Sequence, residues 1–149
     1  MKKLSAKKIY IASDHAGFLL KDFLVKELKK ARFDVIDLGC DSEEKSVDYP
    51  DYAQKLCKKV AEKSSDFGIL ICGSGVGISI AANRFKHIRA ALCHNIKSAK
   101  LARAHNDANV LCLGGRIIKN STALSITRNF LATKFEGGRH EARVRKLSR

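Results

Sequence analysis

The sequence ILICGSGVGISI, residues 69–80, places an apolar run directly before three glycines that alternate with other residues. A short apolar run, a glycine-rich segment and a second apolar stretch are typical of a buried strand, a tight turn and a helix. Cys72 is the last residue of the predicted strand and the first at the turn. The stretch therefore predicts a strand–turn–helix unit of an α/β protein, with a thiol at the carboxyl end of the strand.

The remainder of the chain continues this alternation of strand and helix patterns. Strands are predicted at 8–13, 34–39, 68–72, 88–93 and 109–114, and helices at 18–31, 50–63, 77–84, 96–104 and 121–133. Strands that alternate with helices imply a parallel sheet covered by helices on both faces. The chain contains no internal repeat or linker, and 149 residues is about the length of one domain. We therefore expect a single domain, residues 1–149, with a three-layer α/β fold.

The composition is that of a soluble globular protein, with 45% hydrophobic and 30% charged residues. No apolar run approaches the roughly 20 residues of a membrane span, and the basic N-terminus lacks the apolar stretch of a signal peptide. The five cysteines are an odd number and form no CxxC pair, which argues against a disulfide framework or a zinc site. We expect a cytoplasmic protein that does not interact with membranes.

The net charge of +14 is concentrated in the second half of the chain. Residues 67–149 contain 15 Lys and Arg but only 3 Asp and Glu, and no carboxylate occurs from Phe67 to Asn106. An uneven charge of this kind favours an anionic partner, either a phosphorylated metabolite or nucleic acid. A lysine-rich solvated surface is the alternative. No nucleic-acid-binding motif is present, so we expect no nucleic-acid partner.

The segments that follow the strands carry most of the polar and reactive residues. They are Ser13–Gly17, Cys72–Gly77, His94–Asn95 and Gly114–Arg116. In open parallel sheets, ligands bind beyond the carboxyl ends of the strands, so we expect these segments to converge on one site.

The glycine turn departs from three better-known glycine motifs. Its third glycine comes one residue too early for a dinucleotide fingerprint, and no Gly-Lys-Ser/Thr follows as in a Walker A loop. A hydrolase elbow needs a glycine two residues before Ser74, where this chain has Cys72. Two interpretations remain: an anion-binding turn of backbone N–H groups at a helix N-terminus, or a turn that only packs helix against sheet.

Cys72 has a chemical interpretation that the other strand and helix cysteines lack. A thiol at a helix N-terminus has a lowered pKa, and the thiolate can act as a nucleophile or a general base. Cys57, Cys93 and Cys112 lie within predicted elements and are expected to be inert core residues. An inert role for Cys72 is the alternative.

Two histidines and two arginines complete the set of candidate residues. His15 follows Asp14 in a predicted loop, and His105 lies at the end of a predicted helix; neither shows metal-ligand spacing. Arg139 and Arg143 are four residues apart and would share a helical face suited to bidentate phosphate binding. The alternatives are structural histidines and an ordinary basic surface helix.

Together these motifs resemble the ribose-5-phosphate isomerase B family, which includes the galactose-6-phosphate isomerase subunits. The matching stretches are SDHAGF, DYPDYA, GILICGSGVGISIAANR, IRAALC, ARAHNDANVLCLGGR and FEGGRHEARV, which span nearly the whole chain. The resemblance implies a Rossmann-like fold with a five-stranded parallel sheet. It implies a homodimer, or a tetramer made of two such dimers, whose site is shared between subunits, and no metal or organic cofactor. It also implies interconversion of ribose 5-phosphate and ribulose 5-phosphate in the non-oxidative branch of the pentose phosphate pathway.

The resemblance further implies roles for individual residues. Cys72 is the base that moves a proton between C2 and C1 of the open-chain sugar, and His105 opens the furanose ring with Asn106 beside it. The enediolate oxygen is held by the turn formed by Gly73, Ser74, Gly75, Val76 and Gly77, in which Ser74 also takes part in catalysis. The sugar hydroxyls and the phosphate are bound by Asp14, His15, Tyr49, Arg116, Arg139 and Arg143.

Two features refine the resemblance. Some relatives use a glutamate one residue after the glycine turn, where this chain has Ile78, so it belongs with the cysteine-base group. Related enzymes act on allose 6-phosphate or galactose 6-phosphate, and these remain alternative substrates. The galactose enzymes work as two different chains, whereas this chain contains both Cys72 and His105. The first seven residues extend beyond the common start of the family and are assigned no role.

Overall fold

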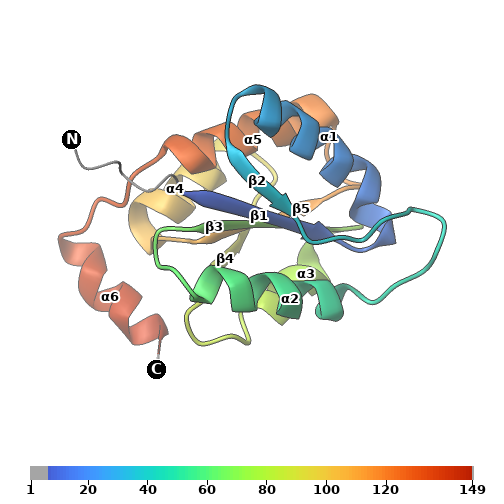
Figure 1. The fold of residues 1–149 in the computed structure, drawn as a ribbon. Coiled ribbons are helices and arrows are strands. Elements are labelled where there is room, and N and C mark those ends of the chain that lie inside the picture. The colour runs from blue at the N-terminus through green and yellow to red at the C-terminus, as the bar shows by residue number, and fades with distance from the viewer. Residues whose placement is uncertain (1–6, 149) are drawn as a thin grey trace.

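The computed structural model describes residues 7–148, which form one five-stranded sheet with helices on both faces (Figure 1). The strands are β1 (Lys8–Ser13), β2 (Asp34–Asp37), β3 (Phe67–Cys72), β4 (Ala90–Leu92) and β5 (Val110–Gly114). The helices are the short 3₁₀ helix η1 (His15–Gly17) and α1 (Phe18–Lys30), α2 (Tyr49–Ala61), α3 (Val76–Ala82), α4 (Ile96–Asn106), α5 (Asn120–Ala132) and α6 (Arg139–Leu147). All strand pairs are parallel, in the order β2-β1-β3-β5-β4. The predicted fold class is confirmed.

Two apolar cores form because successive side chains of each strand point to opposite faces of the sheet. Ile9 and Ile11 of β1 pack with α1, α4 and α5, whereas Tyr10 and Ala12 pack with α2 and α3. Figure 1 shows these two helical layers above and below the sheet. Cys72 belongs to the core on the α2–α3 side, so its side chain faces the first residues of α3.

The helix α1 is tied to β2 by a buried ion pair. Lys21 is 1% exposed, and its Nζ donates to both carboxylate oxygens of Asp37, at 2.7 and 2.9 Å. The Asp37 side chain is 37% exposed, so this carboxylate reaches solvent while the ammonium does not.

Two element boundaries differ from the prediction in ways that affect the site. Strand β2 ends at Asp37 rather than at residue 39, because Gly39 has a φ of +101° that no strand residue adopts. Helix α4 continues to Asn106 rather than to residue 104, and it ends where Asp107 takes a left-handed conformation with a φ of 46°. His105 and Asn106 therefore lie in the last turn of α4.

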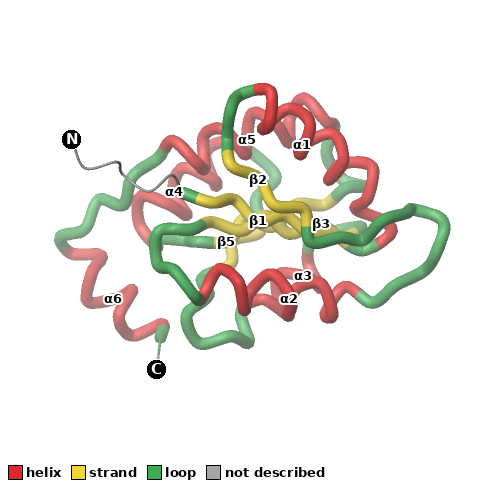
Figure 2. The backbone as a smooth tube through the Cα atoms, viewed as in Figure 1, coloured by secondary structure: helices red, strands yellow, loops and turns green. Residues whose placement is uncertain are grey.

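One loop and one helix lie beyond opposite ends of the strands. Residues 38–48 form the loop before α2, beyond the carboxyl ends of the strands (Figure 2). Helix α6 packs against α4 and lies beyond the end at which β1 begins (Figure 1). Among the described residues, no helix is both long and apolar enough to cross a bilayer.

Candidate functional site

The segments that follow β1, β3 and β5 lie together at the carboxyl edge of the sheet, as expected. The Asp14 N–H donates to the Ile71 carbonyl at 3.2 Å, and the Gly115 N–H donates to the Cys72 carbonyl at 2.8 Å. Strand β1 lies between β2 and β3. The chain therefore forms β2 on one side of β1 and then crosses over to form β3 on the other side. This switch in direction opens a crevice at the ends of β1 and β3, where doubly wound sheets bind ligands.

Cys72 lies directly against the glycine turn. The residue is 4% exposed, and Sγ accepts a hydrogen bond from the Gly75 N–H at 3.2 Å. Gly75 has a φ of +78°, and a Cβ there would lie 2.5 Å from Leu92 Cδ1 and 2.9 Å from the Leu113 carbonyl carbon. Only glycine fits this position, and its backbone conformation is what directs an N–H group at the sulfur.

The rest of the turn is exposed on one side and covered on the other. Ser74 and Val76 are exposed, and the Ser74 hydroxyl accepts the Val76 N–H at 3.1 Å. The Tyr49 ring covers Gly77, where a Cβ would lie 2.5 Å from the ring carbon Cζ. The first residue of α2 thus supplies an aromatic wall next to the turn.

Asp14 and His15 have different environments despite being adjacent. The Asp14 carboxylate is buried and accepts the Gly17 N–H at 3.0 Å, so it caps the turn after β1. His15 Nδ1 accepts the Val47 N–H at 3.1 Å. An accepting Nδ1 leaves Nε2 of the neutral ring as the donor.

Arg116 places a positive charge beside the turn. Its Cδ and Nη1 atoms lie 3.6 Å from the position that a Cβ on Gly73 would occupy. Arg116 and His15 also line a cavity of about 380 Å³ with Glu43 and Asn120. A cation and an imidazole donor at one cavity wall suit an anionic ligand such as a phosphate.

The three cysteines predicted to be inert are buried, and burial disfavours their charged form. Burial raises the pKa of Cys57 to about 12 and that of Cys93 to about 11, and it raises the pKa of Cys112 well above its ordinary value. Their thiolates are therefore negligible at neutral pH.

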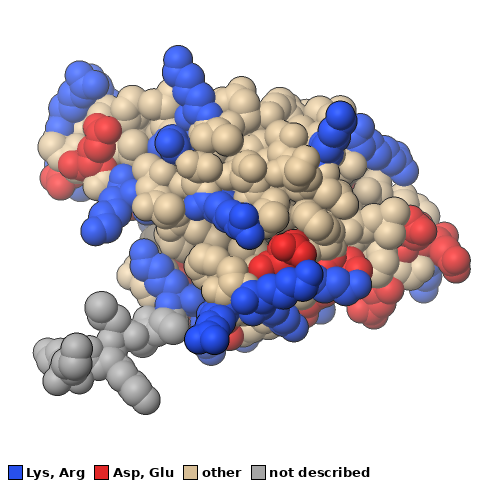
Figure 3. All heavy atoms as spheres, turned by 90° about the horizontal axis from the view of Figure 1, so that it is seen from above, with Lys and Arg blue, Asp and Glu red and all other residues tan. Residues whose placement is uncertain are grey.

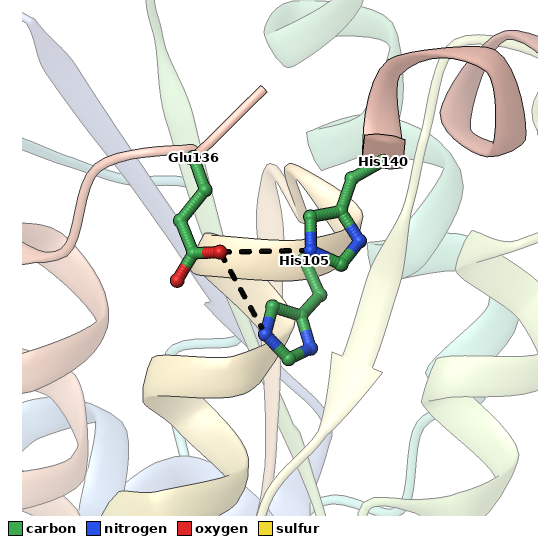
Figure 4. Close-up of side chains that lie close together, drawn as sticks. All are labelled: His105, Glu136 and His140. Carbon is green, nitrogen blue, oxygen red and sulfur yellow. Dashed lines mark ion pairs between the residues drawn. The ribbon is translucent and has the colours of Figure 1, made fainter. Parts of the chain in front are cut away.

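A second group of side chains lies at the opposite, amino edge of the sheet (Figure 4). The His105 and His140 rings are stacked, with centroids 4.3 Å apart and planes 14° apart. Glu136 Oε2 lies 3.9 Å from His105 Nε2 and 3.5 Å from His140 Nε2. The Glu136 N–H donates to the Ala104 carbonyl at 3.0 Å, which fixes the segment before α6 against the end of α4.

His140 is the buried member of this group, and it has a depressed pKa. Burial of the ring is the main cause, and the nearby His105 ring and Arg139 guanidinium add to it. Arg139 Nε donates to His140 Nε2 at 3.5 Å, and both Arg139 and Arg143 are exposed on α6. Glu136 and His140 are not among the site residues predicted from the sequence. Their i, i+4 spacing places them near each other, but nothing in the sequence links them to His105.

The two groups are separated by the length of a strand. Cys72 is paired with Gly114, the last residue of β5, whereas His105 precedes Val110, the first residue of β5. Four strand steps correspond to about 13 Å. Within one chain, the structure brings together the predicted site residues of the carboxyl edge, but it does not bring His105, Asn106, Arg139 or Arg143 to Cys72.

Basic side chains are dispersed on the face covered by α1, α4 and α5. Figure 3 shows Lys and Arg standing apart across this face, with acidic side chains among them at its margins. This distribution differs from the continuous basic stripe that tracks a nucleic-acid backbone.

The sheet, the strand-end thiol and the glycine turn are those of a small α/β enzyme with a candidate site at the carboxyl edge. The chain belongs to the ribose/galactose isomerase family, whose model matches residues 9–147. It is 50% identical over 139 residues to a putative sugar phosphate isomerase of Rickettsia bellii, covering 93% of this chain and 96% of that protein. It is 47% identical over 142 residues to ribose-5-phosphate isomerase B of Escherichia coli, covering 95% of each.

Solved structures show the same similarity. A ribose 5-phosphate isomerase from Thermotoga maritima has a TM-score of 0.92 at 52% identity, covering 95% of this chain and 97% of that one. Ribose-5-phosphate isomerase B from Mycoplasma genitalium, with bound ribulose-5-phosphate, has a TM-score of 0.92 at 46% identity, covering 95% and 93%. The resemblance stated from the sequence motifs is confirmed.

Proposed function

We propose that this protein interconverts ribose 5-phosphate and ribulose 5-phosphate, with Cys72 as the base. The observation that carries the proposal is the position of Cys72 Sγ, at the carboxyl edge of β3 and against the Gly75 N–H. The ribulose-5-phosphate bound to the Mycoplasma genitalium relative supports the choice of substrate.

The reaction needs one base and a means of stabilising a negatively charged oxygen. In the direction from the aldose, the Cys72 thiolate removes the proton from C2, the C2–H electron pair forms the C1=C2 bond, and the C1=O π pair moves to O1 to give an enediolate. The proton of the C2 hydroxyl passes to O1, the C2=O bond of the ketose forms, and the electrons of the C1=C2 bond take the proton back from the sulfur at C1. Since C1 and C2 are neighbours in a planar intermediate, one base can reach both. Backbone N–H groups of the glycine turn and the Ser74 hydroxyl would face the developing oxygen charge.

The phosphate and the ring-opening step need groups that one chain does not place near Cys72. His15 and Arg116 lie on the same edge as Cys72, but His105, Asn106, Arg139 and Arg143 lie on the other. We therefore include in the proposal a homodimer in which a second copy supplies these four residues. There His105 would open the furanose ring, and the arginines would hold the phosphate so that binding energy positions the reacting carbons.

An intersubunit complementation experiment tests both parts of the proposal. Cys72→Ala and His105→Ala should each lose at least about a hundredfold in turnover of ribose 5-phosphate, since each removes a proton-transfer group. A heterodimer of the two variants has one site with neither group and one site with both. Co-refolding equal amounts should give heterodimers in half of the dimers and so restore about a quarter of wild-type activity.

Four outcomes would overturn parts of this proposal. Near-wild-type turnover by Cys72→Ala would remove Cys72 as the base. Dimers that re-form without regaining activity would contradict a shared site, and a monomer with full activity would do the same. A higher kcat/KM for allose 6-phosphate or galactose 6-phosphate, measured in parallel assays, would show that ribose 5-phosphate is not the preferred substrate.

A further inference from the structure

We propose that His105, Glu136 and His140 form a binding site for a divalent transition-metal ion such as Zn²⁺, and that the bound ion inhibits the enzyme. The second half rests on the proposed function, because it requires His105 to act in ring opening. The first half depends only on the side chains of the cluster.

The donor atoms already lie near the spacing that a metal requires. Zn²⁺ binds imidazole nitrogen and carboxylate oxygen at about 2.0–2.2 Å, which places tetrahedral ligands about 3.3 Å from one another. Glu136 Oε2 is 3.5 Å from His140 Nε2 and 3.9 Å from His105 Nε2. All three donor atoms lie within 4.8 Å of one another, so small side-chain rotations would bring them to one ion.

The chemistry of the donors selects the kind of metal. Two imidazoles and one carboxylate suit Zn²⁺, Ni²⁺, Co²⁺ and Cu²⁺, whereas Mg²⁺ and Ca²⁺ prefer oxygen ligands alone. Three protein ligands leave a fourth position open to water, as in catalytic rather than structural zinc sites.

The exposure of Glu136 supports the same assignment. Glu136 is 59% exposed, so an ion can reach the cluster from solvent, and its carboxylate is free to adjust.

The nearby arginines oppose cation binding and limit its affinity. Arg139 Nε donates to His140 Nε2 at 3.5 Å, so a metal must displace this contact. The long contact is a weak hydrogen bond, and both Arg139 and Arg143 are exposed, so solvent and salt screen their charges. We expect a dissociation constant in the micromolar range, roughly 1–50 μM, well above that of structural zinc sites.

Cobalt absorption spectroscopy of the full chain tests the site without reference to activity. Wild-type protein titrated with Co²⁺ should develop visible bands of a low-symmetry, four- or five-coordinate site at one equivalent per chain. Glu136→Gln and His140→Ala should each weaken binding by at least about tenfold. His87→Ala, which removes an exposed histidine outside the cluster, is the matched control and should bind as wild type does.

Two results would overturn the metal site. One is the absence of Co²⁺ bands in the wild type up to about 100 μM, which lies above the expected range. The other is equal affinity in wild type, Glu136→Gln and His140→Ala, which would place the metal elsewhere, for example on a thiol. Glu136 is exposed, so Glu136→Gln is expected to fold, and its thermal melting checks this.

Zinc inhibition tests the second half of the proposal. Zn²⁺ at about ten times its dissociation constant should reduce wild-type isomerase activity by about 90%, and a chelator should restore it. Glu136→Gln should require at least about tenfold more Zn²⁺ for the same inhibition. Equal zinc sensitivity of the two proteins would refute inhibition through this site. A chain that lacks isomerase activity but gives Co²⁺ bands would refute the proposed function and leave the metal site standing.

Discussion

Replacing Gly75 with alanine tests whether the geometry of the glycine turn is as restrictive as the structure indicates. The added Cβ would lie 2.5 Å from Leu92 Cδ1 and 2.9 Å from the Leu113 carbonyl carbon. The Leu92 side chain can move, but the Leu113 backbone belongs to the centre of the sheet and cannot. The alanine must also adopt a φ of +78°.

These two effects give the expected loss of stability. A left-handed conformation costs an alanine about 1–2 kcal/mol, and overpacking a well-packed site costs about 1–3 kcal/mol. Gly75→Ala should therefore lower the free energy of unfolding by about 2–5 kcal/mol. For a chain of this size, 1 kcal/mol corresponds to about 2–4 °C in Tm, so Tm should fall by about 4–20 °C.

Gly73→Ala is the matched control, because it lies two residues away in the same turn. Its Cβ would meet its nearest neighbours, Ala16 Cβ and the Arg116 side chain, at 3.6 Å, which is ordinary contact. We expect a loss of less than about 1 kcal/mol. Urea unfolding followed by circular dichroism measures both variants. A Gly75→Ala protein within about 0.5 kcal/mol of wild type would refute the steric argument.

Three further predictions concern charge and burial. Asp37→Asn should lower the free energy of unfolding by about 3 kcal/mol or more, because it leaves the Lys21 ammonium buried and unpaired. Lys21→Met should lower it by about 1 kcal/mol or less. If urea unfolding gave the reverse order, the buried Lys21–Asp37 ion pair would be contradicted. Because the pKa of His140 is lowered on folding, the unfolded state binds more protons below about pH 6.5, so stability should fall on acidification, and less steeply in His140→Gln. An equal dependence of unfolding free energy on pH in the two proteins would rule out His140 as the cause. At pH 8, alkylation followed by mass spectrometry should leave Cys57 and Cys93 unmodified in the native protein but not in urea, and rapid native labelling would contradict their burial.

The fold could be predicted from the sequence because each strand has a recognisable hydrophobic pattern. The buried strands β3 and β5 appear as continuous apolar runs, and each ends in glycine-containing segments. Such runs are typical of parallel strands covered on both faces, so the number of strands and their direction could be inferred. The end of α4 was missed by two residues, because Asp107 in a left-handed conformation is a stop signal that sequence rarely reveals.

Only part of the candidate site could be predicted from the sequence. Cys72 is the last residue of a strand, and Ser74, His15 and Arg116 follow strands, so the rule about carboxyl edges placed them correctly at that edge. His105 precedes a strand, so the same rule places it at the amino edge, and its role beside Cys72 stays part of the proposed dimer. The cluster with Glu136 depends on how residues 133–138 return to α4, and no local pattern specifies such a path.

The separation of Cys72 from His105 has a consequence for how the family's sequences can change. Under the proposed pairing of subunits, a substitution at Cys72 changes the surroundings of His105 in the partner subunit and not those of His105 in its own chain. Correlated replacements among homologues should then link positions that a single chain keeps a strand's length apart. Such pairs would look like errors in a contact map drawn for one chain, yet they would mark the symmetry axis of the assembly.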